Sequence, residues 1–567
     1  MKRLTFLLAA ATWLCACSTG PQNAAVNNAP HLEKRGQVTQ LIVDGKPYLA
    51  LACELKNSSS TSRAYMAPVW EKLKGTGINT VIGSVSWEQI EPEESRYDFT
   101  AVDDMVKGAR ECGVKLIFIW FGSWKNGISS YQPMWMKQQP ERYFPAETAD
   151  GVQLPILSTL CQAAREADAR AFAATMAHIR DIDSEEHTVI MMQVENEVGL
   201  HGSTRDFCEA ALTAFASEVP AELTSYLSAH ASVLLGETAE VWKAAGSKTS
   251  GSWSEVFGEG DAADEYFMAW NYASYVDAVA AAGKAQYDLP MFVNAWIVQP
   301  SDRHPGDYPS GGPQAQCHDI WRAAAPHIDF LSPDIYLSDY PDILRRYARG
   351  GNPVFVPESK DGLFGAANAA FTFGEMGGFG YSPFGLDASI DAERNQPFYE
   401  FYRCIGSMSD QVLEAQAEGR ITAVWLKGSK PIIFRDKRLM GDWELCFDLV
   451  SSGGRNGGAP TLLGGIYDVD KAGYAIVIAD DEDSFTLLGA NIRVSFRTAD
   501  RQGMAVLGRV FEGRYEDGEW IPGRMLNGDE IQLRYDLVPA AVQGFTGQGL
   551  NFATDHPEII KADLIRN

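Results

Sequence analysis

The sequence predicts an α/β fold: a (β/α)8 barrel of the TIM type, followed by an all-β domain of the sandwich or jelly-roll kind. From about residue 38, short apolar runs alternate with longer stretches of helical periodicity, which is typical of βα units around a parallel sheet. Beyond residue 420 the pattern changes to short β-like runs with Gly, Asp and Asn turns. The 567 residues, 46% of them hydrophobic, provide enough chain for a barrel of about 250 residues or more and an accessory module.

The first 37 residues predict export and a tether. Lys2 and Arg3 precede an apolar run over 4–14, which is long enough for a signal-peptide core and too short to span a bilayer. The run ends in LCACS, which resembles the bacterial lipoprotein processing box, so we expect cleavage before Cys17 and lipid on its thiol. An ordinary signal peptide cut nearby is the alternative. The Ser, Asn, Ala and Pro content that follows predicts a flexible tether over 18–37.

These segments predict an exported protein of the bacterial periplasm or outer membrane, in contact with the membrane only through its lipid anchor. The formal net charge of −26 argues against a nucleic-acid partner, because such a surface repels phosphate backbones. Seven of the nine cysteines lie beyond residue 17, widely spaced and without a CxxC pair, so neither a disulfide framework nor a zinc site is indicated. We expect most of them to be small buried residues.

Eight apolar runs are the predicted strands of a barrel domain over 38–419. Loops that follow the strands of such a barrel build its active-site face, and the connections 121–160 and 197–261 are long enough to do so. A helical stretch over 395–418 closes the barrel, and residues 420–567 form the β domain. The predicted strands are 48–55, 79–85, 115–120, 189–194, 291–297, 329–336, 354–358 and 377–383, and helical periodicity appears at 102–112, 164–182, 263–282 and 320–327.

Two of these strands end in carboxylates. The fourth runs without a break into Glu195, Asn196 and Glu197, and the seventh ends at Glu358. Ionisable groups at the end of a buried parallel strand are costly unless they are used or paired. If the fourth strand stays regular, alternation places Glu195 and Glu197 on one side and Asn196 on the other.

Carboxylates after strands four and seven, facing each other across a barrel mouth, are what retaining glycoside hydrolysis requires. Glu197 is the expected general acid/base and Glu358 the expected nucleophile, with their carboxyl groups about 5–5.5 Å apart. We expect Glu195 to be structural, paired with an Arg or Lys below the pocket. No metal-ligand spacing occurs among the nine histidines, and we expect neither a metal nor a cofactor.

The segments QVENE at 193–197 and PES at 357–359 resemble the β-galactosidases of glycoside hydrolase family 35. The segment VSWEQIEPE at 85–93, followed by YDF at 97–99, looks like the stretch after strand two in families 35 and 42. The resemblance covers roughly residues 38–400. It implies the same roles for Glu197 and Glu358, a contact between Asn196 and the sugar 2-hydroxyl, and a C-terminal module similar to the β domain of a bacterial subgroup of family 35.

Two departures from the family pattern leave the sugar specificity open. Many family 35 members carry Ala-Glu-Trp after strand three, where this chain has FGSWKNG at 121–127. The 160 residues between Glu197 and Glu358 exceed the spacing in many relatives.

Further side chains near the strand ends are candidates for contacts with substrate. Tyr336 is placed to donate a hydrogen bond to Glu358 or to pack on its neighbours. Glu88 is a hydroxyl binder or a local salt-bridge partner. The other candidate hydroxyl binders are Glu54 and Asn126, and the aromatic side chains that serve either as apolar walls for sugar faces or as core are Trp87, Trp124, Trp296 and Phe384.

The predicted function is an exo-acting retaining β-galactosidase, whose partner is a glycan with terminal β-D-galactosyl residues. One alternative is another retaining β-glycosidase on the same fold, such as a β-glucosidase, β-xylosidase or endo-glucanase. The other is a surface lipoprotein that binds glycans without cleaving them.

Overall fold

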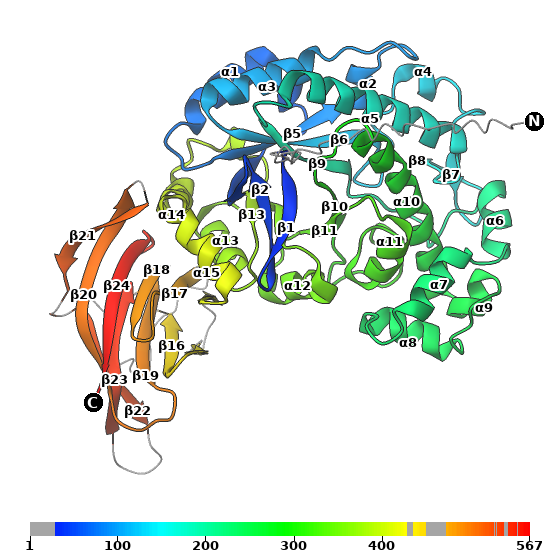
Figure 1. The fold of residues 1–567 in the computed structure, drawn as a ribbon. Helices are drawn as coiled ribbons and strands as arrows, with labels where there is room; N and C mark the ends of the chain where they lie inside the picture. Colours follow the sequence, from blue (N-terminus) through cyan, green and yellow to red (C-terminus); the bar gives the residue numbers. More distant parts are fainter. Residues whose placement is uncertain are drawn as a thin grey trace, which may run out of the picture.

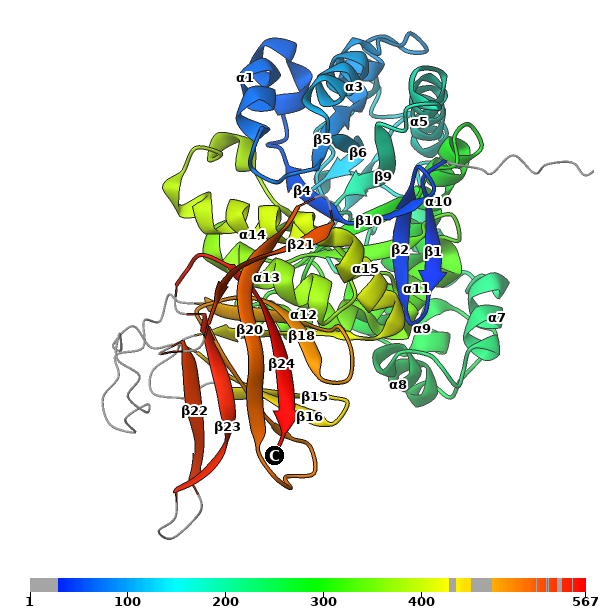
Figure 2. The same cartoon turned by 60° about the vertical axis from the view of Figure 1, so that its left-hand side comes forward.

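The computed structural model contains a barrel and a separate β domain at its side (Figures 1 and 2). It describes residues 29–427, 435–449, 472–516, 518–526, 528, 530–537, 543–552 and 554–567. The predicted signal peptide, its lipidation site Cys17 and residues 18–28 of the predicted tether lie outside the described residues. None of the described helices is both long and apolar enough to cross a membrane.

Eight parallel strands form the barrel, in the order β11-β10-β9-β6-β5-β4-β13-β12. A parallel bridge between Ile335 and Ser359 joins the two ends of this order, so the ring closes. Each of the eight predicted strands is present, which confirms the predicted fold class. The strands are β4 (Ala50–Glu54), β5 (Thr80–Ser86), β6 (Lys115–Lys125), β9 (Val189–Asn196), β10 (Met291–Trp296), β11 (Phe330–Asp334), β12 (Phe355–Ser359) and β13 (Gly380–Pro383).

A small antiparallel sheet packs on the interior of the barrel. It consists of β1 (His31–Arg35), β2 (Val38–Val43) and β3 (Lys46–Tyr48). Leu41 and Val43 of β2 are buried in one apolar cluster with inward residues of the barrel strands. The predicted tether is therefore wrong over residues 31–37: β1 pairs with β2, and Leu32 packs against the same cluster. The charged neighbours of Leu32 hid this short strand.

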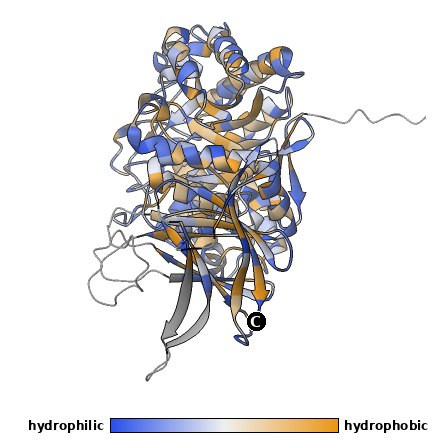
Figure 3. Ribbon diagram, turned by 90° about the vertical axis from the view of Figure 1, so that its left-hand side faces the viewer, coloured by the Kyte–Doolittle hydropathy of each residue, from blue (hydrophilic) through white to orange (hydrophobic). Residues whose placement is uncertain are grey.

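Helices cover the outside of the barrel, and Figure 3 shows them alternating between apolar and polar residues around apolar strands. The four predicted helical stretches correspond to α3, α5, α10 and α11. α3 ends at Gly113, whose φ of 78° is the left-handed conformation that glycine adopts without strain. The helices of this shell are α1 (Arg63–Leu73), α2 (Trp87–Ile90), α3 (Thr100–Cys112), α5 (Gln162–Asp183), α10 (Asp261–Lys284), α11 (His318–Ala324), α12 (Tyr340–Tyr347), α13 (Gly362–Gly374), α14 (Gln396–Ser407) and α15 (Ser409–Glu418).

The two long connections carry structure of their own. The one after β6 contains α4 (Met134–Lys137) and a hairpin of β7 (Pro145–Glu147) with β8 (Gln153–Leu157). The one after β9 folds into four short helices, which form a small group at the side of the barrel (Figure 1). These helices are α6 (Glu209–Ala216), α7 (Ala221–Ala229), α8 (Gly236–Ala244) and α9 (Trp253–Phe257).

In the residues that the structure describes, the C-terminal β domain is one sheet of eleven strands that packs on α13 and α14. On β17, Tyr474 and Ile476 belong to the core shared with the barrel helices, while Ala475 and Val477 face a separate core within the domain. Both faces of this strand are therefore buried. The strands are β14 (Ile421–Lys427), β15 (Arg435–Met440), β16 (Trp443–Leu449), β17 (Ala472–Ala479), β18 (Ser484–Ala490), β19 (Ile492–Thr498), β20 (Ala505–Glu516), β21 (Glu519–Met525), β22 (Ile531–Leu537), β23 (Gln543–Phe552) and β24 (Glu558–Arg566).

Close packing joins the two domains. A Cβ atom on Gly374, the last residue of α13, would lie 2.6 Å from Cβ of Ala423 on β14, so only glycine permits this approach. Five of the cysteines, Cys53, Cys161, Cys208, Cys317 and Cys446, are buried, in agreement with the prediction that most cysteines serve as small buried residues.

Candidate active site

The end of β9 is irregular, and this irregularity separates Glu195, within the strand, from Glu197, just after it. Glu195 and Glu197 have φ angles of 63° and 44°, which are uncommon for residues with a side chain. In the neighbouring strand β6, Trp120 pairs with Val194 but the next pair is Lys125 with Asn196, so residues 121–124 bulge outward opposite Glu195. The strand does not stay regular here, so the condition under which alternation puts Glu195 and Glu197 on one side is not met.

Glu197 and Glu358 come together, as predicted, and a third carboxyl group joins them. One carboxyl oxygen from each of Glu197, Asp334 and Glu358 lies within 4.8 Å of the other two. Glu197 and Asp334 are buried, whereas Glu358 is only partly buried. The three residues stand at the carboxyl ends of β9, β11 and β12, which is the face on which barrels of this type place their active sites.

Different hydrogen bonds hold the two predicted catalytic groups. The hydroxyl of Tyr336 donates a hydrogen bond of 2.6 Å to Oε1 of Glu358, as predicted from the sequence. The backbone N–H of Glu197 donates to Oδ1 of Asn294, on β10, at 2.8 Å. Glu358 is thus bonded through its carboxyl oxygen Oε1, whereas Glu197 is bonded to Asn294 through its backbone N–H.

The surroundings shift the pKa values of Glu197 and Glu358 differently. Burial, and then the nearby Glu358 carboxylate, raise the pKa of Glu197 to about 8. Burial also raises the pKa of Glu358, but the Tyr336 hydrogen bond and the Lys125 charge counteract it. Glu358 raises the pKa of Glu197, whereas Tyr336 and Lys125 hold that of Glu358 down, so Glu197 is the member of the pair that keeps its proton to higher pH.

Sequence reasoning missed Asp334, Asn294 and Lys125. Asp334 is 3% exposed, and its Oδ2 accepts a hydrogen bond of 2.7 Å from Nδ2 of Asn294. Lys125, at the end of β6, lowers the pKa of Glu54, Glu197 and Glu358 through its charge. The sequence did offer a signal for two of them: Asn294 is a polar residue inside an apolar strand, and Asp334 is a polar residue at the end of one.

Three of the predicted hydroxyl binders lie at this mouth. Glu54, at the end of β4, is 2% exposed, and burial together with Glu358 and Glu197 raises its pKa. Asn126 donates its backbone N–H to the carbonyl oxygen of Asn196 at 3.2 Å, and its side chain accepts from Lys125. Oδ1 of Asn196 is buried and meets no hydrogen-bond partner in the described part of the chain, so it retains capacity to accept from a ligand.

Glu195 lies behind the site in a separate buried pair. Its two carboxyl oxygens accept the backbone N–H groups of Ser123 and Trp124, at 3.0 and 2.9 Å. Its side chain also bonds to Asp168 of α5, and burial and that neighbour raise its pKa well above the usual value. The predicted structural role agrees with these contacts, but the predicted Arg or Lys partner is wrong: backbone N–H groups of the β6 bulge and a second acid take that place.

Two of the predicted sugar walls are core residues instead. Trp87 is fully buried in α2, where its indole N–H donates to Glu91 at 2.7 Å. Trp124 is 1% exposed and packs edge-on against Tyr272 and Tyr275 of α10. Tryptophans at strand ends point outward under the helices here, so neither reaches a substrate.

The remaining candidates keep some exposure or take another role. Trp296, at the end of β10, and Phe384, just after β13, are partly buried and stay predicted sugar contacts. Glu88 is exposed and forms a salt bridge of 3.6 Å with Lys137 of α4, which is the alternative that the sequence left open.

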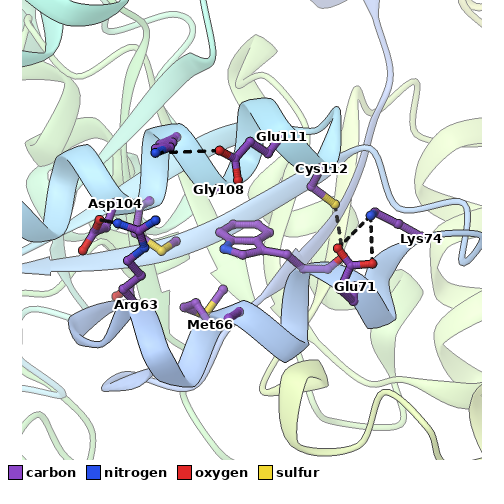
Figure 4. A pocket seen from close by; sticks show the side chains of 13 residues that line it. Arg63, Met66, Glu71, Lys74, Asp104, Gly108, Glu111 and Cys112 are labelled. Carbon is purple, nitrogen blue, oxygen red and sulfur yellow. Dashed lines mark hydrogen bonds and ion pairs between the residues drawn. The ribbon is translucent and has the colours of Figure 1, made fainter.

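A separate cavity of about 350 Å³ lies between α1 and α3 (Figure 4). The pairs Arg63–Asp104 and Lys74–Glu71 stand along it. Its lining comes from these helices and Ser60, and it includes none of the carboxyl groups at the barrel mouth.

Comparison with known families matches two parts of the chain. Residues 59–263 match the glycoside hydrolase family 42 model, described as "Beta-galactosidase". This segment contains Glu197 and ends before Glu358, and the matching family is 42 rather than 35. Residues 398–537 match a domain of unknown function, DUF5597.

Similar individual proteins include a β-galactosidase of Xanthomonas manihotis, 32% identical over 79 residues. That match covers 14% of this chain and 13% of the Xanthomonas protein, so the chain spans about an eighth of this relative's length. A β-amylase catalytic domain from Paenibacillus polymyxa has a TM-score of 0.44 at 12% identity, covering 62% of this chain and 97% of that one. A β-galactosidase from Rahnella sp. R3 has a TM-score of 0.42 at 17% identity, covering 66% and 57%.

Proposed function

We propose that this protein is a retaining, exo-acting β-galactosidase that removes terminal β-D-galactosyl residues from oligo- or polysaccharides. The observation that carries the proposal is the approach of Glu197 and Glu358 oxygens to within 4.8 Å at the barrel mouth. Retaining glycosidases separate their two carboxyl groups by about 5–5.5 Å, whereas inverting enzymes leave about 6.5–9.5 Å for a water molecule. The short approach favours double displacement.

In the first step, an oxygen of Glu358 attacks the anomeric carbon while the bond from that carbon to the leaving oxygen breaks. Glu197 gives its proton to the leaving oxygen. In the second step, the ionised Glu197 takes a proton from water, the water oxygen bonds to the anomeric carbon, and the bond to Glu358 breaks. The first step requires a protonated Glu197 and an ionised Glu358, and the Glu197 pKa of about 8 favours the protonated acid at neutral pH.

The family 42 match and the Xanthomonas relative support a β-galactoside substrate, because both carry the description β-galactosidase. The resemblance to family 35 rests on the motifs at 193–197 and 357–359 alone, since the family model that matches is that of family 42. The family 42 match ends at residue 263, so the geometry around Glu358 supports the nucleophile independently.

A β-glycosidase for another sugar is the second candidate, and the segment after β6 favours keeping it. There the chain presents Lys125 and Asn126 at the site, where many family 35 members carry Ala-Glu-Trp. The Lys125 charge, which lowers the pKa of Glu54, Glu197 and Glu358, bears on which hydroxyl pattern of a bound sugar this site favours.

The test is a panel of nitrophenyl β-glycosides together with NMR detection of the first-formed anomer. We expect kcat/KM for the β-galactoside to exceed that for the β-glucoside and β-xyloside by at least tenfold, and the first product to be the β-anomer. A dominant glucoside or xyloside activity would replace the substrate assignment, and an α-anomer would contradict retention.

We further propose that the chain is exported and lipid-anchored through Cys17 in the periplasm or outer membrane. The LCACS pattern after the apolar run supports this. Metabolic labelling with a fatty acid tests it: the full-length chain should be labelled and Cys17→Ser should not.

A further inference from the structure

Asp334 is a buried acid at the active site without an assigned role in the two-step reaction. Its Oδ2 accepts from Nδ2 of Asn294 at 2.7 Å. Its Oδ1 is fully buried and meets no hydrogen-bond donor among the residues that the structure describes. An unmet buried carboxylate oxygen is costly, so the group facing it has to be identified.

The group facing Asp334 is another carboxyl group. Carboxyl oxygens of Asp334, Glu197 and Glu358 lie within 4.8 Å of one another, and the contact with Asp334 lowers the pKa of Glu197. Carboxylates only accept hydrogen bonds when ionised, so a bond between two of them requires a proton on one. Two like charges at this distance also raise each other's free energy.

Asn294 makes the arrangement rigid. Its Oδ1 accepts the backbone N–H of Glu197 at 2.8 Å, while its Nδ2 donates to Asp334. The amide therefore ties the two acids together through both of its ends. Since Oδ2 of Asp334 is occupied as an acceptor, a proton on Asp334 would be carried by Oδ1.

We propose that Asp334 is a positioning residue that stays neutral and donates a hydrogen bond from its Oδ1–H to the carboxyl group of Glu197. The inference rests on the proposed glycosidase function, because it gives Asp334 a role through the acid/base. In the first step the donated bond orients Glu197 toward the leaving oxygen. In the second step it stabilises the ionised Glu197 that takes a proton from water.

The charges around Asp334 support a neutral form. Burial, and then the facing acids Glu358, Glu197 and Glu54, raise its pKa well above the usual value. In the Glu197–Asp334 pair the hydrogen bond raises the pKa of Asp334 and lowers that of Glu197, so the proton stays on Asp334. The charged and titratable groups around it come from β4, β6, β9, β11, α12 and β12; they are Glu54, Lys125, Glu197, Tyr336, Tyr347 and Glu358.

The test compares Asp334→Asn with Asp334→Ala. An asparagine preserves the pattern, because its oxygen accepts from Asn294 and its amide donates to Glu197. We expect Asp334→Asn to keep kcat/KM within about fivefold and Asp334→Ala to lose about 10- to 100-fold, the effect of one hydrogen bond to a charged group. Asp319→Asn, at a buried aspartate of α11 bonded to Leu235 N–H, is the matched control and should leave kcat/KM unchanged.

The pH profile separates a neutral Asp334 from an ionised one. The basic limb of kcat/KM reports loss of the Glu197 proton, at about pH 8. With a neutral Asp334, the limb of Asp334→Asn stays where it is in the wild type. If Asp334 is ionised, its removal takes away a negative charge and moves the limb to lower pH. Three outcomes would overturn the proposal. One is that shift of the limb to lower pH, and another is a loss of kcat/KM in Asp334→Asn as large as in Asp334→Ala. The third is an activity that EDTA abolishes and Mg²⁺ or Ca²⁺ restores.

Infrared spectroscopy tests the proton without turnover. The wild type at neutral pH should show the C=O stretch of a protonated carboxylic acid that Asp334→Asn lacks and Asp319→Asn retains. Absence of such a difference would contradict the proposal. A protein that shows the band but hydrolyses no glycoside would refute the proposed function and leave the neutral Asp334 standing, so the two failures are distinguishable.

Discussion

Two clusters of buried carboxyl groups flank the end of β9, and they differ in what their oxygens contact. The inner pair, Glu195 and Asp168, is fully buried. Backbone N–H groups bond both oxygens of Glu195, and the Trp120 indole and the Ser123 hydroxyl bond Asp168 at 2.8 and 2.6 Å.

The outer cluster, Glu197, Asp334 and Glu358, is supported by fewer donors. Tyr336 bonds Glu358 and Asn294 bonds Asp334, and Glu358 is partly open to solvent. Burial raises the pKa in both clusters, so a raised pKa by itself does not mark the site. What marks the site is hydrogen-bonding capacity that remains free toward solvent, because a substrate needs groups that the fold has not already used.

The largest effect is expected at Glu358. Replacing Glu358 by Gln keeps the Tyr336 contact but removes the proposed nucleophile, so kcat should fall by about 10⁴-fold or more. Steady-state hydrolysis of a nitrophenyl galactoside measures this loss, and the melting temperature should stay near that of the wild type. Retained turnover would show that the outer cluster does not perform the chemistry.

Glu197→Gln should have the next largest effect, and it should depend on the leaving group. Galactosides with poor leaving groups should lose about 10²- to 10⁴-fold in kcat/KM, because they need a proton, while activated aryl galactosides lose less in the bond-breaking step. The wild-type kcat/KM should fall as pH rises through about 8, where Glu197 loses its proton, and this limb should be absent in the variant. A limb that persists in Glu197→Gln would assign the proton to another group.

The barrel was predictable from the sequence because its strands are buried on both faces and read as uninterrupted apolar runs. Glu197 and Glu358 were predictable for the same reason: a charge at the end of such a run has to be used or paired. Asp334 escaped because the predicted sixth strand ran through it to residue 336, whereas β11 ends at Asp334.

The parts that escaped prediction depend on contacts between distant segments. The sequence placed 121–124 in a loop after the predicted strand 115–120, whereas β6 runs to Lys125 with a bulge at 121–124 whose backbone bonds Glu195. Trp87 and Trp124 follow strands just as a sugar platform would, and their burial under helices becomes visible only in three dimensions. The short strand β1 consists mostly of polar residues and gains its order from pairing with β2.

A stability effect rather than loss of chemistry is expected for Glu195→Gln. The amide places a donor against a backbone N–H of the bulge, so the free energy of unfolding should fall by about 1–3 kcal/mol. The variant should keep kcat/KM within about tenfold. Urea denaturation and steady-state kinetics on the same preparation measure both quantities, and a loss of kcat as large as that of Glu197→Gln would place Glu195 in the outer cluster.

The same variant has a pH signature. The folded-state pKa of Glu195 is raised well above 4.5, so its protonation stabilises the fold fully below pH of about 4.5, and this contribution is lost as pH rises through the folded-state pKa. Wild-type stability should therefore decline toward alkaline pH, and Glu195→Gln should show a shallower decline. If the free energy of unfolding declined with pH equally steeply in the wild type and in Glu195→Gln, the raised pKa of Glu195 would be contradicted.

The smallest effect is expected at Glu88. Like Glu54, this residue lies near the carboxyl end of a barrel strand. Glu54 is the last residue of β4, and the outer cluster raises its pKa. Glu88 lies in α2, which follows β5; it is exposed and forms a salt bridge of 3.6 Å with Lys137. An exposed ion pair contributes about 0–1 kcal/mol, so Glu88→Gln should change neither stability beyond that range nor kcat/KM beyond about twofold. Kinetics beside Lys137→Ala, which removes the same pair from the other side, provide the comparison. A tenfold rise in KM for Glu88→Gln alone would mean that substrate reaches past the barrel mouth to the start of α2, and the boundary drawn around the outer cluster would have to be extended.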